Sequence, residues 1–486
     1  MTHRIDHVVV VGRDAPLWLA AAVLTRALGP SGVTVEAVAL PDAVTESDLY
    51  ASLPSLAALH EQLGIDEATL LQGTGGALTL GWNFVERDSA APSFLHPFGG
   101  FGSPIEGEDF FPQWLRARRH GLTVPLEDFS LTAAAARQGR LFIPSADSDR
   151  YGRSDYGYHL PAAAYANWLR QVALKSGVIA HASHEAEPER DAEGVVTALR
   201  LKGGRRIAGD FFVDAGAGVL VDTPDNPFES WRARFVADRV VTAIGPRFAH
   251  LPVYAETRAF GEGWVALRPC QTGTHITAAW SGGLGGIAGK LADLCGFPVA
   301  GGQERAWEPG LRTRPWNGNC VALGQAACRL DPLHDLELFA VQLGLIHLLR
   351  HFPQGAPYDA SRDAYNRQVR SHFLHLRDFQ SLHYALARYQ GPFWESCRTA
   401  PLSGELAQRI DFFSARGEIA PWEEDDFAAD SWRAFLVGHG TVPDSYPPPA
   451  DTVPPELVKA RFREMLAFVK QQVLRQPTHD FHLSHG

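Results

Sequence analysis

Hydrophobic residues near the start of the chain follow the pattern of a strand, a helix and a second strand. Val8 to Val11 is an unbroken β-branched run, typical of a strand buried on both faces. Residues 18–28 are largely apolar, read as a helix and end at Gly29-Pro30, a helix-exit signal. Val33 to Ala37 alternates as a second strand would, with Glu36 near its end. Because these elements fall within about 30 residues, the pattern predicts the βαβ unit of nucleotide-binding folds and a parallel sheet.

The later pattern predicts an antiparallel sheet and a helical C-terminal region. Helices are expected over residues 55–63, 158–174, 336–349, most of 360–440 and 455–476. The last of these carries an apolar stripe that predicts core packing, formed by Val458, Phe462, Met465, Val469 and Val473. Loops and short strands are expected over residues 75–150, a hairpin turning at Gly203-Gly204, an antiparallel sheet over 250–282 and a mobile loop over 281–289.

The composition is that of a globular chain with a large core. The chain has 486 residues, 45% of them hydrophobic, and a prior of about 150 residues per domain suggests about three units. The 55 acidic residues outnumber the 44 basic ones, which argues against nucleic-acid binding. No apolar run approaches the roughly 18 residues of a membrane span, and no secretory segment precedes Gly12. Five scattered cysteines favour free thiols, so we expect a cytoplasmic protein. From the charge balance and the apolar pattern we expect neither nucleic-acid nor membrane partners.

Motifs for hydrolytic or metal chemistry are not found in the sequence. No Gly-x-Ser-x-Gly elbow indicates a serine nucleophile. Neither a His-Glu-x-x-His pair nor a CxxC pair indicates zinc, so no metal site is expected.

One long motif and several short ones carry a family resemblance. The long motif runs from Arg314 through Gly324-Gln325 to Ala327 and is followed by Asp331-Pro332-Leu333. The short segments are Leu63 to Thr69, His96-Pro97-Phe98-Gly99, Tyr158-His159, Arg377-Asp378-Phe379, His383-Tyr384 and Pro392-Phe393-Trp394. No tripeptide is specific by itself. Their collinear set resembles the flavin-dependent tryptophan halogenases nearly end to end.

The resemblance implies an α/β fold: an FAD-binding flavoprotein-monooxygenase-like module, an inserted substrate-binding mixed β-sheet and a C-terminal helical region. It places the FAD-binding-like module in residues 1–65, 151–230 and 305–355, the substrate-binding sheet and loops in 66–150 and 231–304, and the helical region in 356–486. In this family, reduced FAD, oxygen and a halide give hypohalous acid. The acid reaches a lysine beside a glutamate and halogenates an indole or related ring.

The predicted phosphate turn departs from the glycine pattern that a dinucleotide needs. The three glycine positions hold Gly12, Asp14 and Leu17, so only the first glycine remains. Arg13 and Ala15 complete the turn. A carboxylate about 4 Å from a phosphate costs about 4 kcal/mol at an effective dielectric near 20, which Arg13 offsets in part. In a second interpretation, Asp14 is the N-cap of the helix and stabilises an empty turn.

The other cofactor positions that the resemblance implies are also changed. Gly324, Gln325 and Leu333 fall in the second flavin-contacting segment, where Gln325 replaces an aspartate. Leu49 and Tyr50 are bulky at the place of a glycine-rich strap along the flavin. We therefore expect FAD binding to be weak or absent.

The halogenation pair of the family is replaced. Thr79 stands at the lysine position and has no ammonium group to hold hypohalous acid. His334 stands at the glutamate position, where it can serve as a base near neutral pH. Neither residue is therefore expected to act as the family's catalytic pair does.

The substrate pocket that the resemblance implies is lined by His96, Pro97, Phe98, Trp264 and Arg268. Trp264 is what remains of a two-tryptophan signature, and Arg268 fills its isoleucine position. Arg268 either binds an anionic group or is an exposed or salt-bridged side chain.

Two hypotheses follow, and whether the protein is an enzyme stays open between them. In the first, the chain is a non-halogenating homologue that binds an aromatic small molecule or a peptide, or that forms a homodimer or a heteromer with a paralogous halogenase. In the second, it is an FAD-dependent halogenase or monooxygenase that acts on an indole-type substrate through relocated residues such as His334. We favour the first because functional positions have changed while scaffold segments remain.

Overall fold

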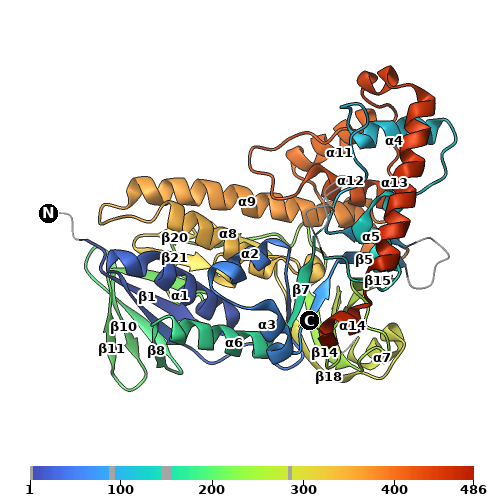
Figure 1. The fold of residues 1–486 in the computed structure, drawn as a ribbon. Helices are drawn as coiled ribbons and strands as arrows, with labels where there is room; N and C mark the ends of the chain where they lie inside the picture. Colours follow the sequence, from blue (N-terminus) through green and yellow to red (C-terminus); the bar gives the residue numbers. More distant parts are fainter. Residues whose placement is uncertain (1–3, 87–92, 144–154, 283–286, 486) are drawn as a thin grey trace. The chain divides into compact units, whose positions relative to one another are not determined.

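The computed structural model describes residues 4–86, 93–143, 155–282 and 287–485 (Figure 1). The chain divides into two compact units. Unit 1 comprises residues 1–76, 160–232 and 307–377, and unit 2 comprises residues 77–159, 233–306 and 378–486. The three-part division of the sequence analysis stays a prediction.

Unit 1 is built on a six-stranded sheet. Its strands, in spatial order, are β20 (Trp316–Asn317), β21 (Cys320–Leu323), β12 (Phe211–Ala215), β1 (His7–Gly12), β2 (Thr34–Ala39) and β8 (Ile179–Ala182). All neighbours are parallel except β20 and β21. Helix α1 (Asp14–Leu28) connects β1 to β2 and packs beside α6 (Ala162–Lys175), as Figure 1 shows. Val8 to Val11 are fully buried, and the predicted βαβ unit is confirmed.

Smaller elements complete unit 1. They are β3 (Leu49–Ala51), α2 (Ser55–Gln62), α3 (Glu67–Thr74), β9 (Ala186–Arg190), β10 (Val196–Leu201), β11 (Arg206–Ala208), β13 (Phe228–Ser230), β19 (Gly310–Arg312), β22 (Cys328–Arg329) and α8 (Glu337–Arg350). Helix α9 (Asp359–Leu386) begins among the residues of unit 1 and ends among those of unit 2. The predicted hairpin at Gly203-Gly204 is confirmed as β10 and β11, and the helix predicted over 336–349 is α8.

Unit 2 contains a seven-stranded mixed sheet. Its strands, in spatial order, are β18 (Ala300–Ala306), β14 (Arg239–Gly245), β17 (Thr274–Trp280), β16 (Gly263–Pro269), β15 (Ala255–Phe260), β5 (Gly81–Glu86) and β6 (Phe94–Pro97). Only β15 and β5 run parallel. One face packs Val265, Leu267 and Ile276 against Leu291 of α7 (Leu291–Cys295). The antiparallel sheet predicted over 250–282 is confirmed.

Helices and two short strands surround this sheet. They are β4 (Ala77–Thr79), α4 (Phe110–Arg119), α5 (Leu131–Arg137), β7 (Gly157–Pro161), α10 (Pro392–Thr399), α11 (Gly404–Arg416), α12 (Ala429–Gly438), α13 (Pro455–Arg475) and α14 (His479–His485). All five residues of the stripe predicted for the last long helix are buried along α13. The fold class expected from the resemblance is therefore confirmed.

Three local predictions differ from the structure. The helix predicted from residue 158 begins at Ala162, because residues 157–161 pair as β7 with β4. Helices α4 and α5 lie where only loops and short strands were predicted. The first contains Pro112, a residue that usually ends a helix, and the second is a short segment of mostly alanine without a polar face. Of the loop predicted over 281–289, residues 283–286 lie outside the described residues.

Candidate functional site

The turn between β1 and α1 keeps one required glycine and replaces another by an aspartate in a glycine-like conformation. A Cβ on Gly12 would lie 2.3 Å from the carbonyl oxygen of Ala215, so only glycine allows β1 to approach β12 this closely. Asp14 has φ +56°, the left-handed region that side chains rarely adopt. The backbone of the second glycine position is thus retained with a different side chain.

The carboxylate of Asp14 does not cap its own helix. The N-cap is Arg13, whose side chain makes no capping bond, so the N-cap interpretation of Asp14 is wrong. Asp14 instead accepts hydrogen bonds from the backbone N–H groups of Ala43 (3.2 Å) and Val44 (3.4 Å) in the segment after β2. Burial raises the pKa of Asp14, and these two bonds oppose the shift.

Few donors remain in the first turn of α1. The backbone N–H of Ala15 is a hydrogen-bonding neighbour of the Tyr50 hydroxyl. Pro16 has no N–H, and Leu17 donates to the carbonyl oxygen of Arg13 within the helix. Burial raises the pKa of Tyr50, and the nearby carboxylates of Glu337, Asp14 and Asp48 raise it further.

The segment predicted as the second flavin contact packs against the same turn. Gly324 has φ +57°, and a Cβ there would lie 3.6 Å from Pro16 and 3.3 Å from Val341. Gln325 donates to the carboxylate of Glu337 at 3.1 Å rather than to a backbone group. Leu333, one residue before His334, is fully enclosed at 1% exposure. The cofactor positions Gly12, Arg13, Ala15, Gly324, Gln325 and Leu333 all belong to unit 1.

Glu36 is turned away from this turn. Strand β2 continues to Ala39, so Glu36 is not near its end as predicted. Its two carboxylate oxygens contact Nε2 of His7 at 2.9 Å and Nε2 of His181 at 2.5 Å. Dinucleotide-binding folds use an acidic residue about 20 residues after the glycines to hold a ribose. In this chain both carboxylate oxygens of Glu36 contact histidines instead.

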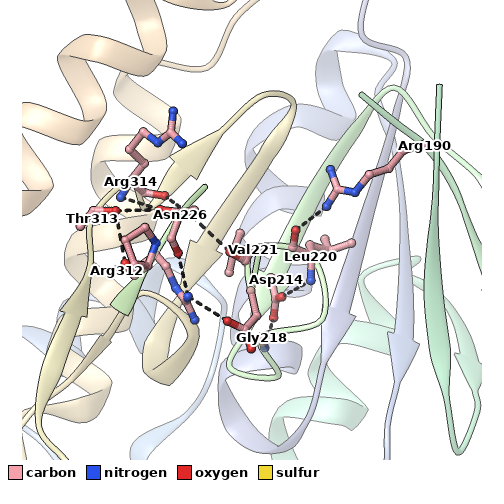
Figure 2. A network of polar contacts seen from close by, with 11 residues as sticks. Arg190, Asp214, Gly218, Leu220, Val221, Asn226, Arg312, Thr313 and Arg314 are labelled. Carbon is pink, nitrogen blue, oxygen red and sulfur yellow. Dashed lines mark hydrogen bonds and ion pairs between the residues drawn. The ribbon is translucent and has the colours of Figure 1, made fainter. Parts of the chain in front are cut away.

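A buried aspartate, Asp214, holds the loop that follows β12 (Figure 2). Strand β12 is the one that Gly12 of β1 approaches closely. Asp214 accepts hydrogen bonds from the backbone N–H groups of Ala217, Gly218 and Leu220. Burial raises its pKa to about 6, although the three amides and Arg312 lower it. Arg312 donates to Asp222 and to the carbonyl oxygen of Asn226, which closes the loop onto β19.

An open cavity of about 470 Å³ lies at the carboxyl ends of β2 and β8. It is lined by residues of α1, α6 and the two strand ends, among them Trp18, Asp42, Arg170 and His184. Ligands of open α/β sheets bind outside the carboxyl ends of the strands, so this is where part of a nucleotide would be expected.

In unit 2, strand register places three of the predicted pocket residues, His96, Trp264 and Arg268, on one face of the sheet, whereas Pro97 lies on the other. Trp82 is opposite His96 in β5 and β6, and the pairing continues through β15 to β16. Because side chains alternate along a strand, Trp264 and Arg268 share the face of His96. They lie on β16, separated from β6 by β15 and β5. The structure therefore places these residues on a common face but not next to one another.

His96 is enclosed by aromatic rings. Its ring centroid lies 4.8 Å from that of Phe435 and 5.0 Å from that of Trp82, and 6.0 Å from that of Phe379. The ring centroid of Phe98 lies 6.5 Å from that of His96. Among the described residues, neither ring nitrogen of His96 has a hydrogen bond of ordinary geometry. Burial lowers its pKa to about 3, so the imidazole is neutral.

The two remaining pocket residues have other surroundings. Trp264 is fully buried and donates its indole N–H to the hydroxyl of Tyr384 at 2.9 Å. Arg268 is 1% exposed and lies opposite His275 in the sheet, and its charge lowers the pKa of His159. Pro97 ends β6 opposite Gly81.

The residues at the family's catalytic positions are both buried. Thr79 is 2% exposed, lies in β4 and donates its hydroxyl to the carbonyl oxygen of Gly81 at 3.2 Å. His334 ends a short 3₁₀ turn after Asp331 and is 1% exposed. Thr79 belongs to unit 2 and His334 to unit 1.

Sequence reasoning missed several residues around these sites. Phe435 and Trp82 line the box around His96, and Pro16 closes the turn at α1. The spacing of Phe379 and His383, four apart on one face of α9, could have indicated an aromatic cluster there but identifies neither Phe435 nor Trp82. Nothing local predicts the two carboxylates, Asp48 and Glu337, that lie near Tyr50.

The described residues offer neither a cluster of metal ligands nor a helix able to span a membrane. Among the described residues, no group of three or more His, Cys, Asp or Glu side chains is arranged to hold a metal ion. Within the same part of the chain, every helix is too short or too polar to cross a membrane.

The chain is similar to solved structures of flavin-dependent halogenases. The flavin-dependent halogenase BrvH from Brevundimonas sp. BAL3 has a TM-score of 0.93 at 28% identity, with 99% of each chain covered. A flavin-dependent halogenase from Xanthomonas campestris has a TM-score of 0.92 at 27% identity, covering 99% of this chain and 98% of that one. The fold is therefore that of the flavin-dependent halogenases.

Sequence comparison identifies the family. The tryptophan 7-halogenase RebH of Lentzea aerocolonigenes is 24% identical over 497 aligned positions, which cover 92% of both chains. The family model described as tryptophan halogenase matches residues 7–455. The chain belongs to the tryptophan halogenase family.

Proposed function

We propose that this chain is a non-halogenating member of its family that binds an aromatic ligand in unit 2. The proposed site is the His96 box, formed by His96 and the rings of Trp82, Phe98, Phe379 and Phe435 around it. The proposal rests on the prediction that Thr79 stands at the position of the family's lysine, together with the observed burial of its side chain. Its hydroxyl is buried and donates to Gly81, so it offers no amino group to an oxidant.

We also propose that FAD binding is weak or absent. A pyrophosphate at the N-terminus of α1 needs free backbone N–H groups and no nearby negative charge. The first turn has the Asp14 carboxylate, a proline at position 16 and an Ala15 amide that faces Tyr50. These residues do not fit a dinucleotide, and no chemical step is assigned to FAD here.

The proposed ligand is a planar ring with an N–H or O–H donor. A neutral imidazole donates through one ring nitrogen and accepts through the other. The backbone of Ser431 lies close enough to raise the pKa of His96, but neither ring nitrogen has a hydrogen bond of ordinary geometry among the described residues. A buried acceptor nitrogen without a donor is costly, so a ligand donor would stabilise it. His96 is 2% exposed, and the ligand therefore takes the place of a covering ring such as Phe435. Relatives named as tryptophan halogenases suggest indoles as the first probes.

The first experiment tests halogenation. The purified protein is incubated with reduced FAD, oxygen, bromide and either tryptophan or larger indoles, beside a competent tryptophan halogenase as positive control. We expect no brominated product by mass spectrometry. Thr79→Lys with His334→Glu should stay inactive unless Asp14 and Leu17 are also changed to glycine. Brominated product from the natural chain would overturn the proposal.

The second experiment tests the ligand site by calorimetry with indole and tryptophan. His96→Phe keeps an aromatic ring but removes the acceptor, so affinity should fall at least about tenfold. Phe435→Ala should strengthen binding, because a cavity lined by apolar rings admits an aromatic guest. His60→Phe, at a buried histidine of unit 1, is the matched control and should leave binding unchanged. Equal affinities in all variants would place the ligand elsewhere.

A further inference from the structure

We propose that residues 42–50, the segment between β2 and the middle of β3, form an internal latch that occupies the phosphate-binding turn of unit 1. The inference rests on the proposed weak or absent FAD binding and gives its physical cause. The ligand class that the latch excludes is any pyrophosphate-bearing nucleotide.

The first contact of the latch is made by Asp14. Its carboxylate holds the backbone N–H groups of Ala43 and Val44. Residue 14 is 5% exposed, Ala43 is exposed and Val44 is half-buried, so these bonds are partly shielded from water. The left-handed φ of +56° turns the side chain of residue 14 toward the latch instead of over its own helix.

The second contact is made by Tyr50 at the other end of the latch. Its ring is 5% exposed, and its hydroxyl faces the backbone N–H of Ala15. A phosphate oxygen bound at this helix end would need that same N–H group. Latch and phosphate are therefore mutually exclusive.

The middle of the latch is held by its own bonds. Asp48 accepts hydrogen bonds from the backbone N–H (2.7 Å) and the hydroxyl (2.9 Å) of Thr45. The carbonyl oxygen of Asp48 accepts from the backbone N–H of Ala162, the first residue of α6. The segment is thus a closed turn fastened to two helices of the same unit.

The charges around the latch act in the same direction. Asp14, Asp48 and Glu337 all lie close enough to Tyr50 to raise the pKa of its hydroxyl. This group of carboxylates favours a neutral hydroxyl and disfavours a phosphate anion. The cavity lined by Trp18 and Arg170 lies at the strand ends of the same unit, so a nucleotide could approach without completing its contacts at α1.

The test releases the latch and uses ADP and inorganic pyrophosphate as probes. The natural chain is compared with the double variant Asp14→Gly, Tyr50→Phe by calorimetry. Glycine keeps the left-handed backbone without the carboxylate, and phenylalanine keeps the buried ring without the hydroxyl. We expect the double variant to bind both probes at least about tenfold more tightly than the natural chain.

Glu46→Gln is the matched control. Glu46 is an exposed carboxylate in the middle of the latch and makes none of the latch bonds described above. This variant should gain no affinity, whereas a gain equal to that of the double variant would show a general charge effect and overturn the latch. Tight ADP binding by the natural chain, or a folded double variant without a gain, would also overturn it.

Hydrogen exchange of the natural chain keeps the inference testable if the double variant does not fold. The amides of Ala43 and Val44 should exchange slowly, and their exchange should not change when ADP is added. Rapid exchange of both amides would contradict the latch. Failure of the latch is distinguishable from failure of the proposed function, because the latter is decided by brominated product and by indole binding in unit 2.

Discussion

One residue, Asp14, combines a conformation that suits glycine with a charge that opposes a phosphate. An L residue in the left-handed region costs roughly 1–2 kcal/mol. Aspartate is among the residues that tolerate this region, because its short side chain can bond to nearby backbone. Here the bonds go to Ala43 and Val44, so the strain and the hydrogen bonds belong to one local arrangement.

Substitution of Asp14 separates these two contributions. Asp14→Gly and Asp14→Ala both lose the carboxylate bonds, so both should be less stable than the natural chain. Alanine additionally keeps the left-handed strain, and Asp14→Ala should therefore be about 1 kcal/mol less stable than Asp14→Gly. Urea unfolding measures the difference. Equal stability of the two variants would contradict the positive φ at this position.

At the scale of elements, the apolar stripe of α13 shows how a helix is fixed by one face. Val458, Phe462, Met465, Val469 and Val473 are all buried. Phe462 has its ring centroid 5.0 Å from that of Phe129 and 5.4 Å from that of Phe110. The stripe was legible in the sequence because successive members recur every three or four residues.

Two substitutions on α13 compare its buried and exposed faces. Phe462→Ala should lower the free energy of unfolding by about 3–5 kcal/mol, because it leaves a cavity beside the rings of Phe110 and Phe129. Leu474→Ala lies on the same helix at 55% exposure and should change it by less than about 0.5 kcal/mol. Thermal and urea unfolding of both variants provide the measurement. Similar losses would show that the stripe is not what anchors α13.

Sequence periodicity predicted some elements and missed others for a common reason. α13 and α8 have clear faces, whereas α4 begins with two phenylalanines and a proline and α5 is a short alanine-rich helix. Helices of the latter kind are defined by what they pack against. Strand β7 was misassigned because its pairing with β4 involves residues about 80 positions apart, which no local pattern reports.

At the scale of the whole molecule, buried neutral histidines couple stability to pH. Burial lowers the pKa of His96, His159 and His439 to about 3 and of His60 and His479 to about 4. All but His60 belong to unit 2. Their stabilising contribution is complete above the unfolded value near 6.5 and is lost as the pH falls toward the folded values.

Acid should therefore destabilise the protein strongly below pH 6.5. Each of these histidines contributes a loss of about 1.4 kcal/mol per pH unit. Asp214 of unit 1 acts in the opposite sense below pH 6, because its folded carboxyl has a raised pKa of about 6 and takes up a proton first. Hydrogen exchange at decreasing pH should show unit 2 opening before unit 1. His96→Phe should make the fall less steep, and an unchanged pH dependence would contradict the burial of that imidazole.

The sequence by itself determined the βαβ unit, the antiparallel sheet, the stripe of α13 and the family, because these follow from short-range periodicity and from ordered motifs. That Thr79 and His334 stand at the family's lysine and glutamate positions stays a prediction from the resemblance. Only the tertiary structure decided that Asp14 bonds to the segment after β2, that Tyr50 faces the start of α1, and that Phe435 covers His96. Hydrogen-bond partners and desolvation depend on segments distant in sequence, and folding alone brings those segments together.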